Sequence, residues 1–187
     1  MKSVRAFIAV NIDEALREKI AALVSGLTLL GVKWVRAENL HLTLKFLADI
    51  SESEAAKVVD TLNNALYEIK SFDITLKGIG AFPNERRPKV IWVGITNAEN
   101  LSKLQGRIDD CLSEVGFKRE ERDFSPHLTI GRVKTPDGSS DFSLKTQKIK
   151  DAVFGDMKVD TVYLMKSDLF PAGPTYSELK SFKLIPG

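Results

Sequence analysis

Apolar residues recur at helical spacing in three stretches of the chain. In the first stretch, Asp13 can cap the start of a helix and Gly31 follows the last apolar position, which predicts a helix between them. In the second stretch, Ser51 and Glu54 form a capping-box pattern ahead of the apolar positions. The third stretch runs up to Gly116. The apolar positions are Leu16, Ile20, Leu23, Leu27 and Leu30; Val58, Leu62, Leu66 and Ile69; and Leu101, Leu104, Ile108, Leu112 and Val115.

Between these helices the pattern favours strands, because short β-prone runs are bounded by turn residues or alternate between apolar and polar positions. The order along the chain begins with strand, helix, strands and helix, and the C-terminal part returns to strands. A short helix is expected near residues 143–151. The predicted strands are Val4–Ile12, Lys33–Arg36, His41–Leu47, Phe72–Leu76, Lys89–Ile95, His127–Val133, Met157–Lys166 and Tyr176–Leu184.

Composition limits the class of protein. A chain of 187 residues with 43% hydrophobic content fits one large domain or two small lobes that share a core. Its one cysteine, Cys111, excludes an intramolecular disulfide and a zinc site built from cysteines. The apolar run before Asp13 is too short for a signal peptide or a membrane span. We therefore expect a cytoplasmic protein that does not enter a membrane.

Charge argues against a protein that coats nucleic acid. The chain has 27 Lys and Arg against 25 Asp and Glu, a formal net charge of +2, so any nucleic-acid contact should be local. Basic residues gather at 86–89, 118–122 and 145–150. Such clusters usually lie on a solvated surface. They would gain a different meaning if the fold brought them around one cleft.

The chain's two histidines, His41 and His127, are each followed by Leu, Thr and an aliphatic residue. In an extended strand, each histidine shares a face with the threonine two positions later, opposite the aliphatic pair. If the aliphatic faces pack on separate helices, the polar faces can line a common cleft. The echo is only four residues long, too short to establish an internal duplication.

Two imidazoles and two hydroxyls in one cleft suit acid-base chemistry on a phosphodiester. Because the histidine pKa is about 6.5, a neutral and a protonated imidazole coexist near neutral pH, one as base and one as acid. Threonine hydroxyls can donate to the non-bridging phosphate oxygens. Two alternatives remain: half-buried strands with locally bonded histidines, and a metal site. The metal site is disfavoured because no carboxylate completes either motif.

Several segments together resemble the two-histidine (2H) phosphoesterase superfamily. Within it, the chain is most similar to the RNA 2′,3′-cyclic phosphodiesterases, also called 2′-5′ RNA ligases. The similarity extends over nearly the whole chain. It is carried by RAFIAV (Arg5–Val10), NLHLTLKFL (Asn39–Leu47), VIWVG (Val90–Gly94), SPHLTIGR (Ser125–Arg132) and LMKSDLFPAGPTYSEL (Leu164–Leu179).

The resemblance implies an α+β fold with two antiparallel β-sheets and outer helices around a central cleft. We accordingly expect residues 1–187 to form a single bilobal domain. Family members open a terminal 2′,3′-cyclic phosphate to a 2′-phosphate without a metal or other cofactor. Some members also join RNA ends through a reversible 2′-5′ linkage without ATP.

The family's site residues transfer onto this sequence by position. His41 and His127 become the catalytic pair, with His41 as acid for the departing O3′ and His127 as base for water. Thr43 and Thr129 become the phosphate-binding hydroxyls. Arg132 matches a nucleotide-binding arginine, although strict alternation would turn it away from the cleft unless a bulge near Gly131 re-aims it.

Four further aromatic and small residues fall within the family's motifs. Phe7 matches an aromatic that can stack on a base, whereas a core role is the alternative. Tyr176 and Trp92 are expected to pack. Ala48 departs from the glycine that many relatives carry after the strand, outside the chemistry.

The sequence therefore predicts a metal-independent enzyme that hydrolyses RNA-terminal 2′,3′-cyclic phosphates. The alternative is a non-catalytic nucleotide- or RNA-binding module that uses the same cleft. The expected partners are RNA ends or small cyclic nucleotides, tRNA fragments among them, and we expect the protein to be a monomer.

Overall fold

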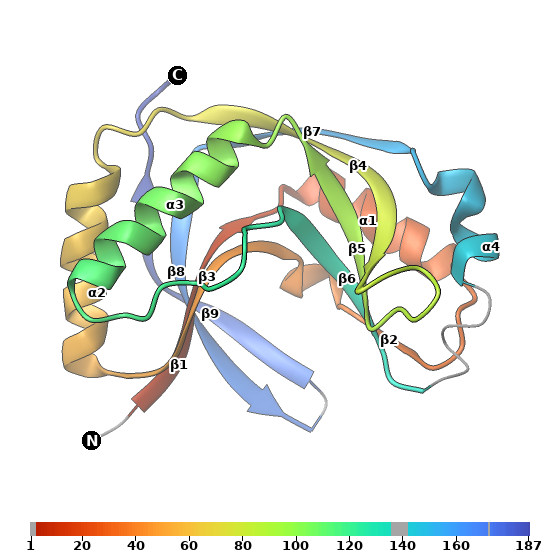
Figure 1. Cartoon of the computed structure of the whole chain (residues 1–187), viewed down its shortest axis with the longest axis horizontal. Coiled ribbons are helices and arrows are strands. Elements are labelled where there is room, and N and C mark those ends of the chain that lie inside the picture. Colours follow the sequence, from red (N-terminus) through yellow and green to blue (C-terminus); the bar gives the residue numbers. More distant parts are fainter. Residues whose placement is uncertain (1–2, 136–141, 172) are drawn as a thin grey trace.

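The structure is a computed structural model that describes residues 3–135, 142–171 and 173–187. Helices and strands alternate along the first two thirds of the chain, and strands dominate its end (Figure 1). In chain order the elements are β1 (Ser3–Asn11), α1 (Glu14–Gly26), β2 (Val32–Trp34), η1 (Ala37–Asn39), β3 (His41–Ser51), α2 (Glu52–Leu66), β4 (Phe72–Phe82), β5 (Val90–Thr96), α3 (Glu99–Glu114), β6 (His127–Val133), α4 (Phe142–Thr146), η3 (Gln147–Ile149), β7 (Val153–Val159), β8 (Thr161–Phe170) and β9 (Gly173–Lys183).

The strands form two antiparallel sheets. One has the order β3-β1-β8-β9 and the other has the order β2-β6-β5-β4-β7. The two sheets approach each other where β3 lies against β6. Because β3 begins with His41 and β6 begins with His127, the two histidine strands adjoin. The predicted α+β architecture is confirmed.

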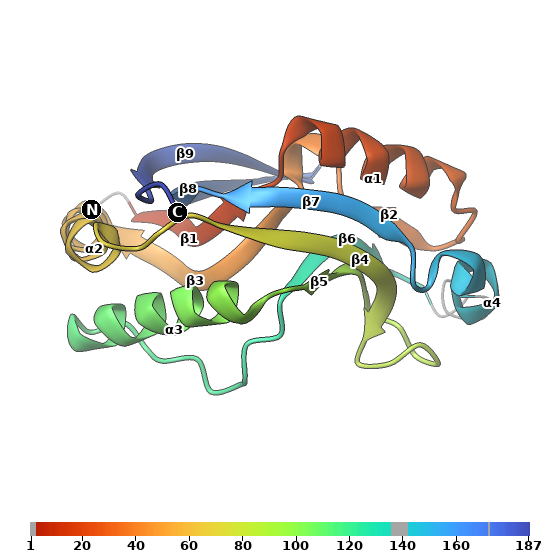
Figure 2. The same ribbon diagram turned by 90° about the horizontal axis from the view of Figure 1, so that it is seen from above.

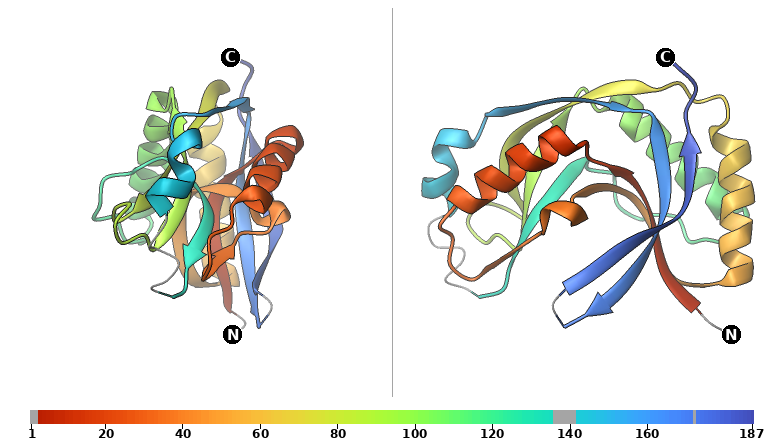
Figure 3. Two further views of the ribbon diagram at one scale, coloured as in Figure 1. Left: turned by 90° about the vertical axis from the view of Figure 1, so that its right-hand side faces the viewer. Right: turned by 180° about the vertical axis from the view of Figure 1, so that it is seen from behind.

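Helices cover the outer side of each sheet. The four-stranded sheet carries α2 and α3, which also pack against each other, whereas α1 packs against β7 of the five-stranded sheet. Figure 2 shows α1 and α3 on opposite sides of the molecule, and Figure 3 shows α2 at the end remote from α4. Within the described residues, no helix is long and apolar enough to cross a membrane.

The core explains which face of each histidine strand is left for chemistry. Leu42 and Leu44 of β3 are buried, as are Leu128 and Ile130 of β6. Each buried aliphatic pair packs into the hydrophobic core that the sheets share with the helices. The predicted division of both motifs into an apolar face and a polar face is confirmed.

The first helix is shorter than predicted. It ends at Gly26 rather than near Gly31, because Leu27 takes an extended conformation. Leu27 and Leu30, whose spacing predicts that they belong to the helix, therefore lie in the loop after it. In this loop Leu29 is buried and Leu30 is exposed. In contrast, the capping box predicted at Ser51 is confirmed, with both of its hydrogen bonds present.

The predicted strand from Met157 to Lys166 is two strands, β7 and β8, which lie in different sheets. Asp160 separates them. Its backbone carbonyl accepts a hydrogen bond from the N–H of Leu184 at 2.8 Å, and its carboxylate accepts one from the Thr161 hydroxyl at 2.8 Å. These contacts fix the position at which the chain passes from one sheet to the other.

The strand β3 contains an extra residue, Leu44. Thr43 pairs with Ala9 of β1 and Lys45 pairs with Ile8, which leaves Leu44 without a partner. A bulge of this kind interrupts the alternation of side chains. As a result Lys45 turns to the core side of the sheet, although strict alternation would place it beside His41.

The strand β6 contains an equivalent extra residue, Ile130. Thr129 pairs with Trp92 of β5 and Gly131 pairs with Ile91, which leaves Ile130 without a partner. The extra residue occupies the third position after the histidine in both strands. The two halves of the fold therefore share a local irregularity as well as a motif.

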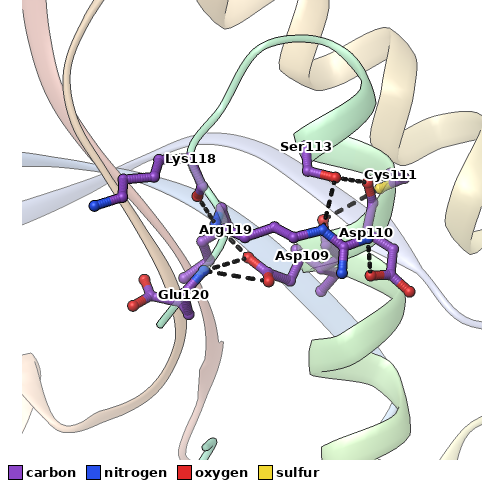
Figure 4. Close-up of polar contacts among 9 residues, drawn as sticks. Asp109, Asp110, Cys111, Ser113, Lys118, Arg119 and Glu120 are labelled. Carbon is purple, nitrogen blue, oxygen red and sulfur yellow. Dashed lines mark hydrogen bonds and ion pairs between the residues drawn. The ribbon is translucent and has the colours of Figure 1, made fainter. Parts of the chain in front are cut away.

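Lys45 forms a buried ion pair with Asp109 of α3. Its ammonium group also donates to the backbone carbonyl of Lys118 at 2.7 Å, and the Asp109 carboxylate accepts from the N–H of Glu120 at 3.3 Å. Figure 4 shows Asp109 turned toward the backbone of Glu120. This network joins the His41 strand to the loop that leads to His127.

The same loop has a second, exposed attachment to α3. The guanidinium of Arg119 contacts the Asp110 carboxylate at 2.7 Å and the Ser113 hydroxyl at 3.2 Å (Figure 4). Exposed ion pairs usually contribute less than about 1 kcal/mol. We therefore assign the positioning of the loop mainly to the buried pair.

We predict that Lys45→Met lowers the free energy of unfolding by about 3–5 kcal/mol, because it leaves the buried Asp109 carboxylate without its cation. Lys118→Met is the matched control, since it removes an ammonium from an exposed pair with Glu121, and it should cost less than about 1 kcal/mol. Urea unfolding curves measure both changes. Equal losses for the two variants would show that the buried pair does not hold the fold.

Candidate active site

His41 is the first residue of β3, directly after the short helix η1. Its Nδ1 lies 2.7 Å from the backbone carbonyl oxygen of Asn39. Asn39 is itself buried, and its side-chain amide donates to the carbonyl of Pro174 in β9 at 2.9 Å. The Asn39 carbonyl orients the imidazole, and Asn39 is itself fixed by its hydrogen bond to β9.

His127 has the same local arrangement at the start of β6. Its Nδ1 lies 2.7 Å from the backbone carbonyl oxygen of Ser125. Because a carbonyl oxygen can only accept, Nδ1 carries the proton in both histidines. Each Nε2 is therefore the nitrogen that is free to take up or release a proton.

The two imidazoles differ in their surroundings. The His41 ring lies 4.8 Å from the Phe7 ring and 5.1 Å from the Tyr176 ring, centroid to centroid. Burial lowers the pKa of His41 below 6.5, and the hydrogen bond to Asn39 opposes this effect only in part. The His127 ring lies 5.0 Å from the Phe82 ring, centroid to centroid.

Both threonines lie on the same side as their histidines. Thr43 pairs with Ala9 and His41 pairs with Asn11, two positions further along β1, so the two side chains share a face. We call this side of the four-stranded sheet the His41 face, and the side that carries His127 and Thr129 the His127 face. Among the described residues, neither threonine hydroxyl has a hydrogen-bond partner.

The extra residue in β6 re-aims Arg132. Arg132 pairs with Val90 and Thr129 pairs with Trp92. Because Val90 and Trp92 are two positions apart in β5, Arg132 and Thr129 point to the same side. The predicted re-aiming of Arg132 is confirmed, with Ile130 rather than Gly131 as the extra residue.

The positive charge of Arg132 also acts on Tyr176, which belongs to the other sheet. Burial raises the pKa of Tyr176, and the positive charges of Arg132 and Arg5 oppose that increase. Tyr176 lies on β9 and contacts His41. The charge of Arg132, on the His127 face, therefore acts at the ring that packs against His41.

The aromatic candidate Phe7 is almost fully buried, with 3% of its surface exposed, whereas neighbouring Phe46 is 61% exposed. The two residues pair across β1 and β3, and their ring centroids are 6.2 Å apart. Phe46 lies two positions after the extra residue of β3, just as Arg132 lies two positions after the extra residue of β6. Phe46 thus presents an exposed ring on the His41 face, and Phe7 lies between this ring and His41.

Sequence reasoning missed Asn39 and Phe82, which contact the histidines, and Phe46, which contacts Phe7. Asn39 stands two positions before His41, as Ser125 does before His127, and this equal spacing was the one available signal. The predicted packing role of Tyr176 is confirmed by its contacts with Phe7 and His41. Within the described part of the chain, no three His, Cys, Asp or Glu side chains cluster as ligands of a metal ion would.

Comparison with a family model of LigT-like phosphoesterases gives two matches, to residues 10–92 and to residues 93–176. Each matched segment contains one of the histidines and the extra residue three positions after it. The two halves of the chain are thus similar to the same family model.

Several curated proteins are similar to this chain over nearly its whole length, and each is named RNA 2′,3′-cyclic phosphodiesterase. The protein of Methanothermobacter thermautotrophicus is 39% identical over 97% of this chain and 99% of its own length. That of Methanocaldococcus jannaschii is 39% identical, with coverage of 95% and 99%. That of Thermotoga maritima is 36% identical, with coverage of 94% and 92%.

Solved structures have the same fold. A Thermus thermophilus protein aligns with a TM-score of 0.81 and 27% sequence identity, and the alignment covers 97% of this chain and 98% of that one. Escherichia coli LigT complexed with 3′-AMP aligns with a TM-score of 0.82 at 23% identity, with coverage of 98% and 99%. The architecture is thus shared over almost the full length of these chains.

The lowered pKa of His41 predicts how stability depends on pH. The folded protein holds His41 neutral, while the unfolded chain takes up a proton near pH 6.5. The free energy of unfolding should therefore fall as pH decreases from about 6.5 through the lowered pKa. His41→Asn keeps a donor near the Nδ1 position but does not titrate, so this variant should lose less stability between about pH 7.5 and pH 5. Urea unfolding across this range measures the difference, and identical pH slopes would contradict it.

Proposed function

This chain belongs to the LigT-like phosphoesterase family, and we propose that it opens RNA-terminal 2′,3′-cyclic phosphates to 2′-phosphates by two-histidine acid-base catalysis. The observation that carries the proposal is the matched geometry of His41 and His127. Each imidazole has its Nδ1 bound to the carbonyl two residues earlier, which leaves Nε2 for proton transfer. The proposal is supported by near full-length similarity to proteins named RNA 2′,3′-cyclic phosphodiesterase.

The reaction needs one neutral and one protonated imidazole. The neutral Nε2 removes a proton from water while the water oxygen bonds to phosphorus, and the bond from phosphorus to O3′ breaks. The protonated Nε2 gives its proton to O3′. The products are a 2′-phosphate and a free 3′-hydroxyl, and the imidazoles have exchanged their protonation states.

The assignment of acid and base remains the one that family resemblance implies, with His41 as the acid. In the free protein, burial disfavours the protonated form of His41. An anionic substrate beside the ring favours that form. We propose that binding of the cyclic phosphate charges His41, so that the acid is prepared only when substrate is present.

The neighbouring residues have separate roles in this proposal. Thr43 and Thr129 donate their hydroxyls to the non-bridging phosphate oxygens, where charge is held in the transition state. Arg132 supplies a positive charge on the His127 face. Phe46 offers the aromatic surface for the terminal base because its ring is exposed, whereas the buried ring of Phe7 packs against both Phe46 and His41.

The partners follow from the same chemistry. The substrate is the 3′ end of an RNA such as a tRNA fragment, or a small cyclic nucleotide. We propose that the protein acts on it as a monomer in the cytoplasm, without a metal or other cofactor. Reversible 2′-5′ joining of RNA ends uses the same step, with a 5′-hydroxyl in place of water.

The proposal is tested with adenosine 2′,3′-cyclic phosphate in the presence of a chelator. We predict that the 2′-phosphate is the only product. His41→Ala and His127→Ala should each lower kcat on the order of a hundredfold or more, because each removes one acid-base partner. The double variant should be little worse than either single variant, since the pair acts as a unit.

The outcome also separates the enzyme from its alternative. Circular dichroism must first show that the variants are folded. Saturable nucleotide binding without product would favour the non-catalytic binding module. Near-native turnover in both single alanine variants would contradict the two-histidine mechanism.

A further inference from the structure

A cavity of about 1190 Å³ lies on the His127 face and contains neither histidine. Trp92 of β5 belongs to its lining and pairs directly with Thr129 of β6, so the cavity begins one residue away from a proposed phosphate-binding hydroxyl. The remaining lining comes from the end of β5, from β4 and the loop after it, from α4 and from the two residues after η3.

The indole of Trp92 lies against the sheet. A Cβ atom at Gly80 would be 2.3 Å from Cη2 of the indole, and a Cβ atom at Gly94 would be 3.4 Å from Cζ3. Because neither glycine has a side chain, the indole can lie directly against the backbone of β4 and β5. One side of the ring covers Gly80, and the ring also borders the cavity.

The indole is connected to the candidate active site through one aromatic ring. The centroid of Phe82 lies 5.3 Å from that of Trp92 and 5.0 Å from that of His127. Imidazole, phenyl ring and indole thus follow one another along the His127 face. A ligand strand that extends from His127 in this direction would pass Phe82 and then reach the indole.

Three cations line the cavity, from three separate segments of the chain: Lys77, Arg86 and Lys150. Lys150 is paired with Glu85 at 3.0 Å, and Asp151 is a further acid in the lining. Lys77 and Arg86 have no ion pair among the described residues. Two of the basic clusters in the sequence, 86–89 and 145–150, therefore contribute to one cavity.

We propose that this cavity is a subsite for a nucleotide of single-stranded RNA outside the nucleotide that reacts. The base stacks on Trp92, and Lys77 and Arg86 bind the phosphates. Stacking on an aromatic ring combined with cations along the backbone is how proteins bind single strands without reading their sequence. The inference rests on the proposed function for its RNA substrate.

The proposal is tested by comparing a mononucleotide 2′,3′-cyclic phosphate with a short RNA that ends in the same group. Arg86→Glu should raise KM for the RNA on the order of tenfold and change hydrolysis of the mononucleotide less than about twofold. Arg87→Glu is the matched control, because this substitution makes the same charge change at a neighbouring residue that does not line the cavity. Equal effects of the two variants on KM for the RNA would overturn the subsite.

A binding measurement keeps this test separate from that of the proposed function. Fluorescence anisotropy of a labelled RNA without a cyclic phosphate should show weaker binding to Arg86→Glu than to Arg87→Glu, whether or not the protein has activity. If wild-type protein hydrolyses neither substrate, the proposed function fails, and the anisotropy comparison alone decides the subsite.

Photocrosslinking identifies which strand enters the cavity. A 5-iodouridine is placed in the RNA that carries the cyclic phosphate, or in a second RNA with a free 5′-hydroxyl, and crosslinked peptides are identified by mass spectrometry. A crosslink to Trp92 from either strand supports the subsite and names its occupant. Crosslinks confined to other peptides would overturn it.

Discussion

An extra residue three positions after the histidine of each histidine strand decides which side chains surround the candidate site. Leu44 in β3 and Ile130 in β6 have no partner in their ladders, so the alternation of side chains changes sides after them. In β3 the change turns Lys45 into the core and Phe46 to the His41 face. In β6 it turns Arg132 to the His127 face. Without these two residues, the exposed ring and the guanidinium would lie on the wrong sides of their sheets.

The two halves use this irregularity differently. In β3 the residue after the bulge is Lys45, whose buried pair with Asp109 ties the strand to the loop before His127. In β6 the corresponding residue is Gly131, where a Cβ atom would lie 2.7 Å from the Trp34 ring. Trp34 therefore covers β6 directly, with no ion pair. The same local framework thus carries an aromatic ring on one side of the site and a positive charge on the other.

Much of this arrangement could be predicted from local signals in the sequence. The capping box at Ser51, the start of both histidine strands and the re-aimed Arg132 depend on nearest neighbours, and the structure confirms them. The burial of Lys45 could not be predicted, because a lysine next to alternating residues is most simply a surface charge. Its partner Asp109 lies on a helix 64 positions away.

Long-range contacts explain the other differences. The helical spacing of Leu27 and Leu30 gave no sign that the chain turns extended at Leu27. The β-prone residues on both sides of Asp160 read as one strand in the sequence. The break between β7 and β8 is marked by the hydrogen bond of Asp160 with distant Leu184, which the sequence does not reveal. The charged cavity beside Trp92 likewise depends on segments that meet only in the folded protein.

The central claim is that His41 and His127 act on one phosphate group. A crystal structure of the protein with adenosine 2′-phosphate, the proposed product, tests it most directly. We predict that Nε2 of both imidazoles lies within hydrogen-bond distance of oxygens on the same phosphate, with the hydroxyls of Thr43 and Thr129 beside them. A phosphate that contacts only one imidazole, or that binds elsewhere on the molecule, would contradict this account.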